Sequence, residues 1–166
     1  HSVCVSARFQ AAPKESHLMA VKRILRYLVG TKNLYLMYPI FDKFELKGYS
    51  DADYGGCYTR KSTFGTATLL CSSIISWGSM KEPSVSLSTT QSEYIAASLV
   101  WTQLIWLKQQ LRDYGIIFEA IPIYCDNKSA IDISKNPSQH SRTKHIDIRH
   151  HFLRDHVEKG NIKIIF

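Results

Sequence analysis

The chain has 166 residues, of which 45% are hydrophobic and 21% carry a charged side chain. These proportions are those of an ordinary globular domain, and they exclude an intrinsically disordered chain. The formal net charge of +7 indicates a polyanionic partner such as nucleic acid. A basic surface without such a partner would give the same net charge, so both interpretations stay open. No apolar run reaches the ~18 residues of a membrane span, so we expect no membrane partner.

The four cysteines stand at positions 4, 57, 71 and 125, without the paired spacing of a zinc ribbon or finger. We therefore expect reduced thiols in a cytoplasmic or nuclear protein. No secretory signal is present, and the chain begins at His1, so we expect an excerpt of a longer protein.

An amphipathic helix is predicted over residues 18–28, because apolar side chains recur there at helical spacing and Gly30 follows as a stop. Strands are expected at 34–38 and 46–49, and the second leads directly to Asp51. A turn at 55–63, rich in Gly, Thr, Arg and Lys, precedes two strands at 66–71 and 74–77 that form a hairpin.

In the second half of the chain, a capping signature at 89–93 opens a long helix that extends to about residue 111. Its apolar residues cover most of the circumference, so we expect burial between layers. A strand at 121–125 ends on Asp126 and a short helix follows at 128–134. Residues 146–157 predict a basic, histidine-rich helix and 162–166 a last strand.

Three acids lie at positions typical of a catalytic or metal site. Asp51 and Asp126 are predicted at strand ends, and Glu93 in the first turn of a long helix. Strand ends and helix starts converge on one edge of a mixed sheet. Carboxylates gathered there repel one another unless a cation is present, and hard oxygen ligands favour Mg²⁺ or Mn²⁺. Two such ions about 4 Å apart activate a water and stabilise the leaving oxygen of a phosphodiester.

Each of these acids also has a purely structural interpretation. Glu93 lies three residues after Thr90 and completes a possible capping box, Asp126 is placed to cap the following helix, and Asp51 is placed to brace the turn at 55–56. The pattern alone leaves both interpretations open.

Six segments, in the right order, resemble the ribonuclease H region of copia-type retrotransposon polyproteins, those of plants especially. They are 48–54 (GYSDADY), 60–63 (RKST), 75–77 (ISW), 87–96 (LSTTQSEYIA), 125–131 (CDNKSAI) and 142–152 (RTKHIDIRHHF). Residues 8–10 and 17–28 are similar to the segment that joins the reverse transcriptase to the nuclease. The resemblance thus implies a connection segment at 1–45 and a ribonuclease H-like domain at 46–166.

The same resemblance implies an α/β fold with a five-stranded mixed sheet and helices on both faces. It implies hydrolysis of the RNA strand of RNA–DNA hybrids with two divalent cations, Mg²⁺ or Mn²⁺. By motif, Asp51 corresponds to the first-strand aspartate that bridges both ions, Glu93 to the first-helix glutamate, and Asp126 to the aspartate that ends the fourth strand. The implied partners are the hybrid and the reverse transcriptase portion of the same polyprotein, within a retrotransposon particle.

One departure from the family concerns its fourth aspartate, which lies on a helix beyond the last strand, whereas the sequence ends at Phe166. We therefore expect a C-terminally truncated domain without that final helix, with weak or absent cleavage. Asp53, on the same strand face as Asp51, and Asp147 are the candidates to replace the missing ligand. The alternative function is a non-catalytic nucleic-acid-binding or interaction module derived from a retrotransposon.

Four further residues, Arg60, Lys61, Asn127 and Lys128, are expected to contact nucleic acid because they lie close in sequence to the acids. The C-terminal histidines are not spaced to share one helical face, so we assign them, with Arg154, to a solvated basic helix that touches phosphates. The three tryptophans are expected in the core. They are Trp77, Trp101 and Trp106.

Overall fold

The computed structural model describes residues 2–40, 43–56, 61–83, 85–135 and 152–166. The chain divides into two compact units, His1–Tyr38 and Pro39–Phe166. The boundary predicted between residues 45 and 46, which separates a connection segment from a nuclease domain, stays a prediction.

The first unit consists of α1 (Ser2–Ala7) and α2 (Glu15–Gly30), and α2 contains the predicted amphipathic helix. Neither helix has a buried residue, and Leu18 and Leu25 of α2 are more than half exposed. Residues 34–38 form no strand, so the strand predicted there is wrong. A strand needs a neighbouring strand for its backbone hydrogen bonds, and a short apolar sequence alone does not supply one.

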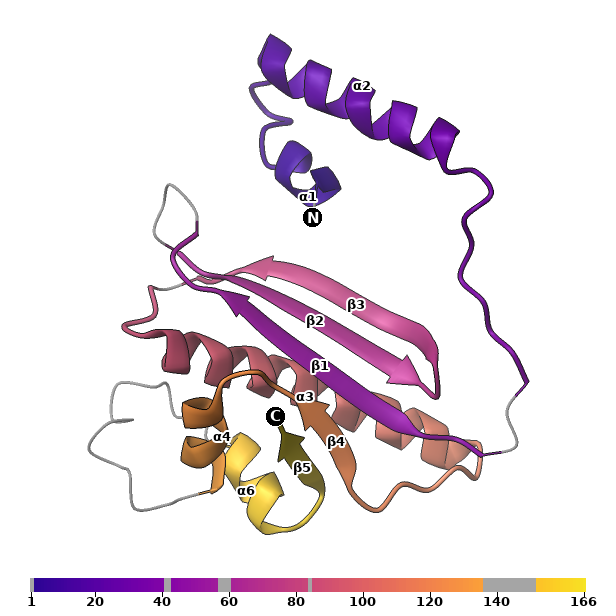
Figure 1. Cartoon of the computed structure of the whole chain (residues 1–166), viewed down its shortest axis with the longest axis vertical. Helices are drawn as coiled ribbons and strands as arrows, with labels where there is room; N and C mark the ends of the chain where they lie inside the picture. The colour runs from indigo at the N-terminus through magenta and orange to yellow at the C-terminus, as the bar shows by residue number, and fades with distance from the viewer. Residues whose placement is uncertain (1, 41–42, 57–60, 84, 136–151) are drawn as a thin grey trace. The chain divides into compact units, whose positions relative to one another are not determined.

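The second unit is built on a five-stranded mixed sheet in the order β3-β2-β1-β4-β5 (Figure 1). Its strands are β1 (Leu46–Asp53), β2 (Thr63–Leu70), β3 (Ser73–Lys81), β4 (Ile121–Tyr124) and β5 (Ile162–Ile165). The first three strands pair antiparallel, whereas β4 pairs parallel with both β1 and β5. The α/β class and the mixed sheet are therefore confirmed.

The described helices of this unit are α3 (Thr89–Asp113), α4 (Lys128–Lys135) and α6 (Phe152–Glu158), and all three contribute to one core against one face of the sheet. From the sheet this core takes Leu46, Ile121, Ile123, Ile162 and Ile164. On the opposite face the rings of Tyr49 and Tyr124 stack 4.8 Å apart. Helices on both faces were expected, and the described helices cover one.

The buried residues of α3 all lie between Gln91 and Leu104, most of them in its first half, so the prediction that this helix is largely buried between layers is wrong for its second half. The buried part packs closely on β1, because a Cβ added at Gly48 would collide with the side chains of Val100 and Leu104. Trp101 lies in the core as predicted, whereas Trp77 and Trp106 are 65% and 57% exposed. These two tryptophans were wrongly assigned to the core.

Helix α6 is the described part of the predicted basic helix, and it is not simply solvated. Arg154 is buried, which contradicts its predicted contact with phosphates. The ring of His156 packs edge-on against Trp101, with 5.1 Å between centroids, and burial together with the nearby Lys159 lowers the pKa of His156. The other four histidines of the region and Asp147 lie outside the described residues.

Among the residues that the structure describes, no helix combines the length and the hydropathy needed to span a bilayer.

Candidate metal centre

The register of β1 and β4 places two of the predicted acids at the same edge of the sheet. The parallel strands pair Gly48 with Ile123 and Tyr49 with Tyr124. Asp51 and Asp126 each follow two residues after the paired tyrosines, and both are exposed. Asp51 still lies in β1, where it pairs with Gly65 of β2, and Asp126 follows the end of the neighbouring β4, so this edge gathers two carboxylates.

The third acid reaches this edge from α3. Glu93 is only 6% exposed, and its Oε1 accepts a hydrogen bond from the backbone N–H of Ala52 at 3.0 Å. Because Ala52 directly follows Asp51, this bond holds the Glu93 carboxylate against β1 beside the predicted site.

Helix capping does not account for Glu93, since α3 is capped by other residues. The N-cap is Ser88, whose Oγ accepts from the N–H of Gln91 at 3.1 Å. The side chain of Gln91 in turn accepts from the N–H of Leu87 at 2.8 Å. The interpretation of Glu93 as part of a capping box with Thr90 is therefore wrong.

Capping also fails to account for Asp126. Helix α4 begins at Lys128, and the residue that caps it is Asn127, whose Oδ1 accepts from the N–H of Ala130 at 3.0 Å. Asp51, for its part, lies within β1 and not in the turn that follows. Neither Glu93 nor Asp126 thus has the capping role that its sequence position suggested.

A thiol joins the acids at this edge. Ligand atoms of Glu93, Cys125 and Asp126 all lie within 4.8 Å of one another, and Cys125 Sγ is 4.0 Å from Glu93 Oε2. Cys125 was not predicted as a site residue. Its sequence signal was its place directly before Asp126, but strand alternation assigns that position to the core, where the residue is indeed buried.

The electrostatics of the edge favour a cation. Burial raises the pKa of Glu93 to about 7, the charges of Asp126 and Asp51 add to the rise, and the Ala52 hydrogen bond opposes it. Burial likewise raises the pKa of the Cys125 thiol. Because a bound cation relieves the repulsion among carboxylates, and carboxylate oxygens are the ligands that Mg²⁺ and Mn²⁺ prefer, the donor set fits these ions.

The residues predicted to contact nucleic acid have different surroundings. Lys128 is exposed, with its Nζ 4.7 Å from the centroid of the Phe166 ring. The Lys61 Nζ donates to the carbonyl of Pro83, which joins it to the loop before α3. Asn127 serves as the cap of α4, and Arg60 lies outside the described residues. Among the three of these residues that the structure describes, Lys128 has the exposed charge that a phosphate contact requires.

Of the two candidate replacement ligands, the structure describes only Asp53. It ends β1, and a Cβ added at Gly56 would collide with its carboxylate. The Asp53 side chain therefore folds back onto the turn that follows β1.

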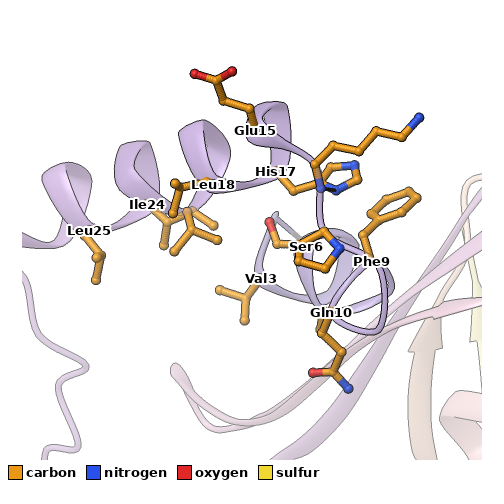
Figure 2. A pocket seen from close by; sticks show the side chains of 13 residues that line it. Val3, Ser6, Phe9, Gln10, Glu15, His17, Leu18, Ile24 and Leu25 are labelled. Carbon is orange, nitrogen blue, oxygen red and sulfur yellow. Dashed lines mark hydrogen bonds between the residues drawn. The ribbon is translucent and has the colours of Figure 1, made fainter.

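A separate pocket of about 820 Å³ lies in the first unit, between α1 and α2 (Figure 2). Its lining is mostly apolar and includes Val3, Phe9, Leu18 and Leu25. It contains none of the predicted site residues, so it is not part of the metal centre.

No family model matches the chain. It is 44% identical over 166 residues to the retrovirus-related Pol polyprotein from transposon TNT 1-94 of Nicotiana tabacum, 99% of the chain being covered. It is 38% and 35% identical over 161 residues to the Pol polyproteins from transposons RE1 and RE2 of Arabidopsis thaliana, with 96% covered in each case. The chain spans 12%, 11% and 11% of the length of these three relatives. It thus belongs to the family of retrovirus-related Pol polyproteins of plant transposons, of which it matches one segment.

Proposed function

We propose that the second unit is a metal-dependent endonuclease of the ribonuclease H type, which cleaves the RNA strand of RNA–DNA hybrids during reverse transcription of a retrotransposon. The observation that carries the proposal is the convergence of Asp51, Glu93 and Asp126 from two parallel strands and a helix onto one edge of the sheet. Membership of the family of retrovirus-related Pol polyproteins of plant transposons supports it, because the segments that carry the three acids resemble the ribonuclease H region of such polyproteins.

Asp51, Glu93 and Asp126 would hold divalent cations, Mg²⁺ or Mn²⁺. Bound there, the ions would supply a nucleophilic water and neutralise the charge that develops on the phosphodiester. The carboxylates fit this task because Asp51 and Asp126 are exposed at the surface and Glu93 is buried and oriented by Ala52. A carboxylate that is fixed before the ion binds loses little entropy on binding.

The substrate class is supported by charge. The chain carries +7, and Lys128 is an exposed cation two residues from Asp126. A lysine in this position attracts a phosphate of the backbone and brings the neighbouring phosphodiester toward the carboxylates. The reverse transcriptase portion of the same polyprotein is the proposed partner that supplies the hybrid.

The test is cleavage of a labelled RNA–DNA hybrid by the 166-residue chain, with duplex DNA and double-stranded RNA as competing substrates. We expect weak cutting of the RNA strand with Mg²⁺ or Mn²⁺ and none with a chelator. Asp51→Asn, Glu93→Gln and Asp126→Asn each lower the rate by about 100-fold or more, because each removes a ligand.

The matched control is Asp132→Asn, an exposed acid of α4 that lies outside the cluster and should not change the rate. Cleavage that survives all three site substitutions would contradict the proposal. Binding of the hybrid without cleavage, by a chain shown to be folded, would favour the non-catalytic nucleic-acid-binding module instead.

A further inference from the structure

Cys125 lies beside the proposed carboxylate site but has no role in the proposed cleavage reaction. It is 3% exposed, and its backbone N–H donates to the carbonyl of Ile165 at 2.9 Å, which fixes its place at the end of β4. The sulfur faces the Glu93 carboxylate, 4.0 Å from Oε2, and Asp126 is its neighbour in the chain. A thiol in this position is not needed by Mg²⁺, which takes oxygen ligands.

The distances suit a tetrahedral ion bound by sulfur and oxygen. Zn²⁺ lies about 2.3 Å from a thiolate sulfur and about 2.0 Å from carboxylate oxygens, so its ligands are roughly 3.5 Å apart. The ligand atoms of Glu93, Cys125 and Asp126 lie within 4.8 Å of one another, so an ion bound among them would have to draw them together by at most about 1.3 Å. Among the described residues no other set of three His, Cys, Asp or Glu side chains meets this criterion.

We propose that Cys125, Glu93 and Asp126 form a thiolate-containing site for Zn²⁺ or another thiophilic divalent cation, which competes with Mg²⁺ for the same two carboxylates. The competition rests on the proposed function, whereas the binding of Zn²⁺ does not. On binding, the S–H bond of Cys125 breaks, its proton passes to solvent and a Zn–S bond forms, with no change of oxidation state.

The selectivity follows from the softness of the ligands. Thiolate sulfur increases the affinity for Zn²⁺ and for its spectroscopic substitute Co²⁺, while carboxylates alone favour Mg²⁺ and Mn²⁺. One cysteine beside two acids therefore makes the edge a site at which a trace of zinc displaces a large excess of magnesium.

The test uses the full chain, freed of metal and kept reduced by a phosphine, titrated with Co²⁺ in the absence of nucleic acid. We expect the near-ultraviolet charge-transfer band of a cobalt–thiolate bond, complete at one equivalent and abolished by Zn²⁺. Cys125→Ser removes the band. The matched control is Cys71→Ser, a buried cysteine whose Sγ donates to the carbonyl of Lys43 at 3.3 Å, and it keeps the band.

The affinities supply the second measurement. In Cys125→Ser the ratio of Zn²⁺ affinity to Mg²⁺ affinity falls by at least about 100-fold, more than the loss of an outer-shell partner causes, and in Cys71→Ser it does not change. A band that persists in Cys125→Ser, a wild-type chain without a band, or an unchanged affinity ratio would each overturn the proposal.

X-ray absorption of the zinc-loaded wild-type chain tests the same point without a variant. One sulfur neighbour at about 2.3 Å supports the site, and none or several refute it. These readouts are independent of cleavage. A cobalt band without Mg²⁺-dependent cutting would support the zinc site and contradict the nuclease function. Mg²⁺-dependent cutting without a cobalt band would support the nuclease function and contradict the zinc site.

Discussion

Glu93 shows at the residue scale how a buried carboxylate links stability to a possible function. The pKa of Glu93 is about 7 in the folded chain and 4.5 for an ordinary glutamate, as in the unfolded chain. Between these values the folded state binds more protons than the unfolded state, so a rise in pH lowers stability. The carboxylate is thus kept in an unfavourable environment, as at many functional sites.

The consequence is a measurable pH dependence. In chelator, the free energy of unfolding should fall by up to about 3 kcal/mol as the pH rises from 4.5 to 7, because one pKa unit corresponds to about 1.4 kcal/mol. Denaturant titrations at several pH values measure it, and Glu93→Gln should flatten the slope. Mg²⁺ should restore stability at the upper end of this range in the wild-type chain only. A slope of the opposite sign would contradict the burial of this carboxylate.

Lys128 is a second residue whose role can be measured separately from cleavage. Lys128→Ala should weaken binding of an RNA–DNA hybrid and reduce the slope of log affinity against log salt by about 1, since one phosphate contact is lost. Fluorescence anisotropy over a range of salt concentrations gives both values. The control is Lys135→Ala, an exposed lysine at the other end of α4. An equal effect of both changes would show that only the overall charge matters.

At the scale of elements, two adjacent residues before α4 have different roles: Asn127 caps the helix, and Asp126 belongs to the proposed metal site. Asn127 and Asp126 are adjacent and both were suspected of function, yet only Asn127 accepts a hydrogen bond from the helix, at Ala130. The division lets Asp126 turn to Glu93 and Cys125 while its neighbour holds the helix in place.

This division predicts opposite effects for neighbouring substitutions. Asn127→Ala should lower the free energy of unfolding by about 1 kcal/mol through loss of the cap, whereas Asn127→Asp keeps the cap and the stability. Asp126→Asn should leave the cap intact and remove Mg²⁺-dependent stabilisation. Urea titrations with and without Mg²⁺ separate the two. If Asn127→Ala costs no stability but abolishes metal binding, the roles assigned to the two residues are reversed.

At the scale of the whole molecule, the two units differ in how they can be stable. In the unit Pro39–Phe166 one core joins the sheet to α3, α4 and α6, the helices that the structure describes there, whereas α1 and α2 bury none of their residues. Two short helices without a core contribute little stability of their own, because isolated helices of this length are marginal in water.

We therefore expect a chain that begins at Pro39 to fold with the same Tm as the full chain, within about 2 °C, because a change of 1 kcal/mol shifts the Tm of such a domain by about 4 °C. Thermal unfolding followed by tryptophan fluorescence and by circular dichroism measures this. A loss of 5 °C or more would mean that the first unit stabilises the second.

The sequence by itself determined the elements of the second unit and their order. Helical or alternating spacing, turn residues and caps are local properties, so α3, α4 and the five strands lie where the pattern predicted them, with shifts of a few residues at their ends. The three acids were also visible in the sequence, because each follows or opens an element whose type could be predicted.

Only the tertiary structure decided what surrounds these residues. Cys125 lies 32 positions from Glu93 in the chain, and their approach depends on how α3 packs on β1 and β4. The exposure of Trp77 and the burial of Arg154 were unpredictable for the same reason, since a side chain is buried only where another element covers it. Sequence pattern shows which face a residue occupies, and packing between distant segments decides whether that face meets water, protein or an ion.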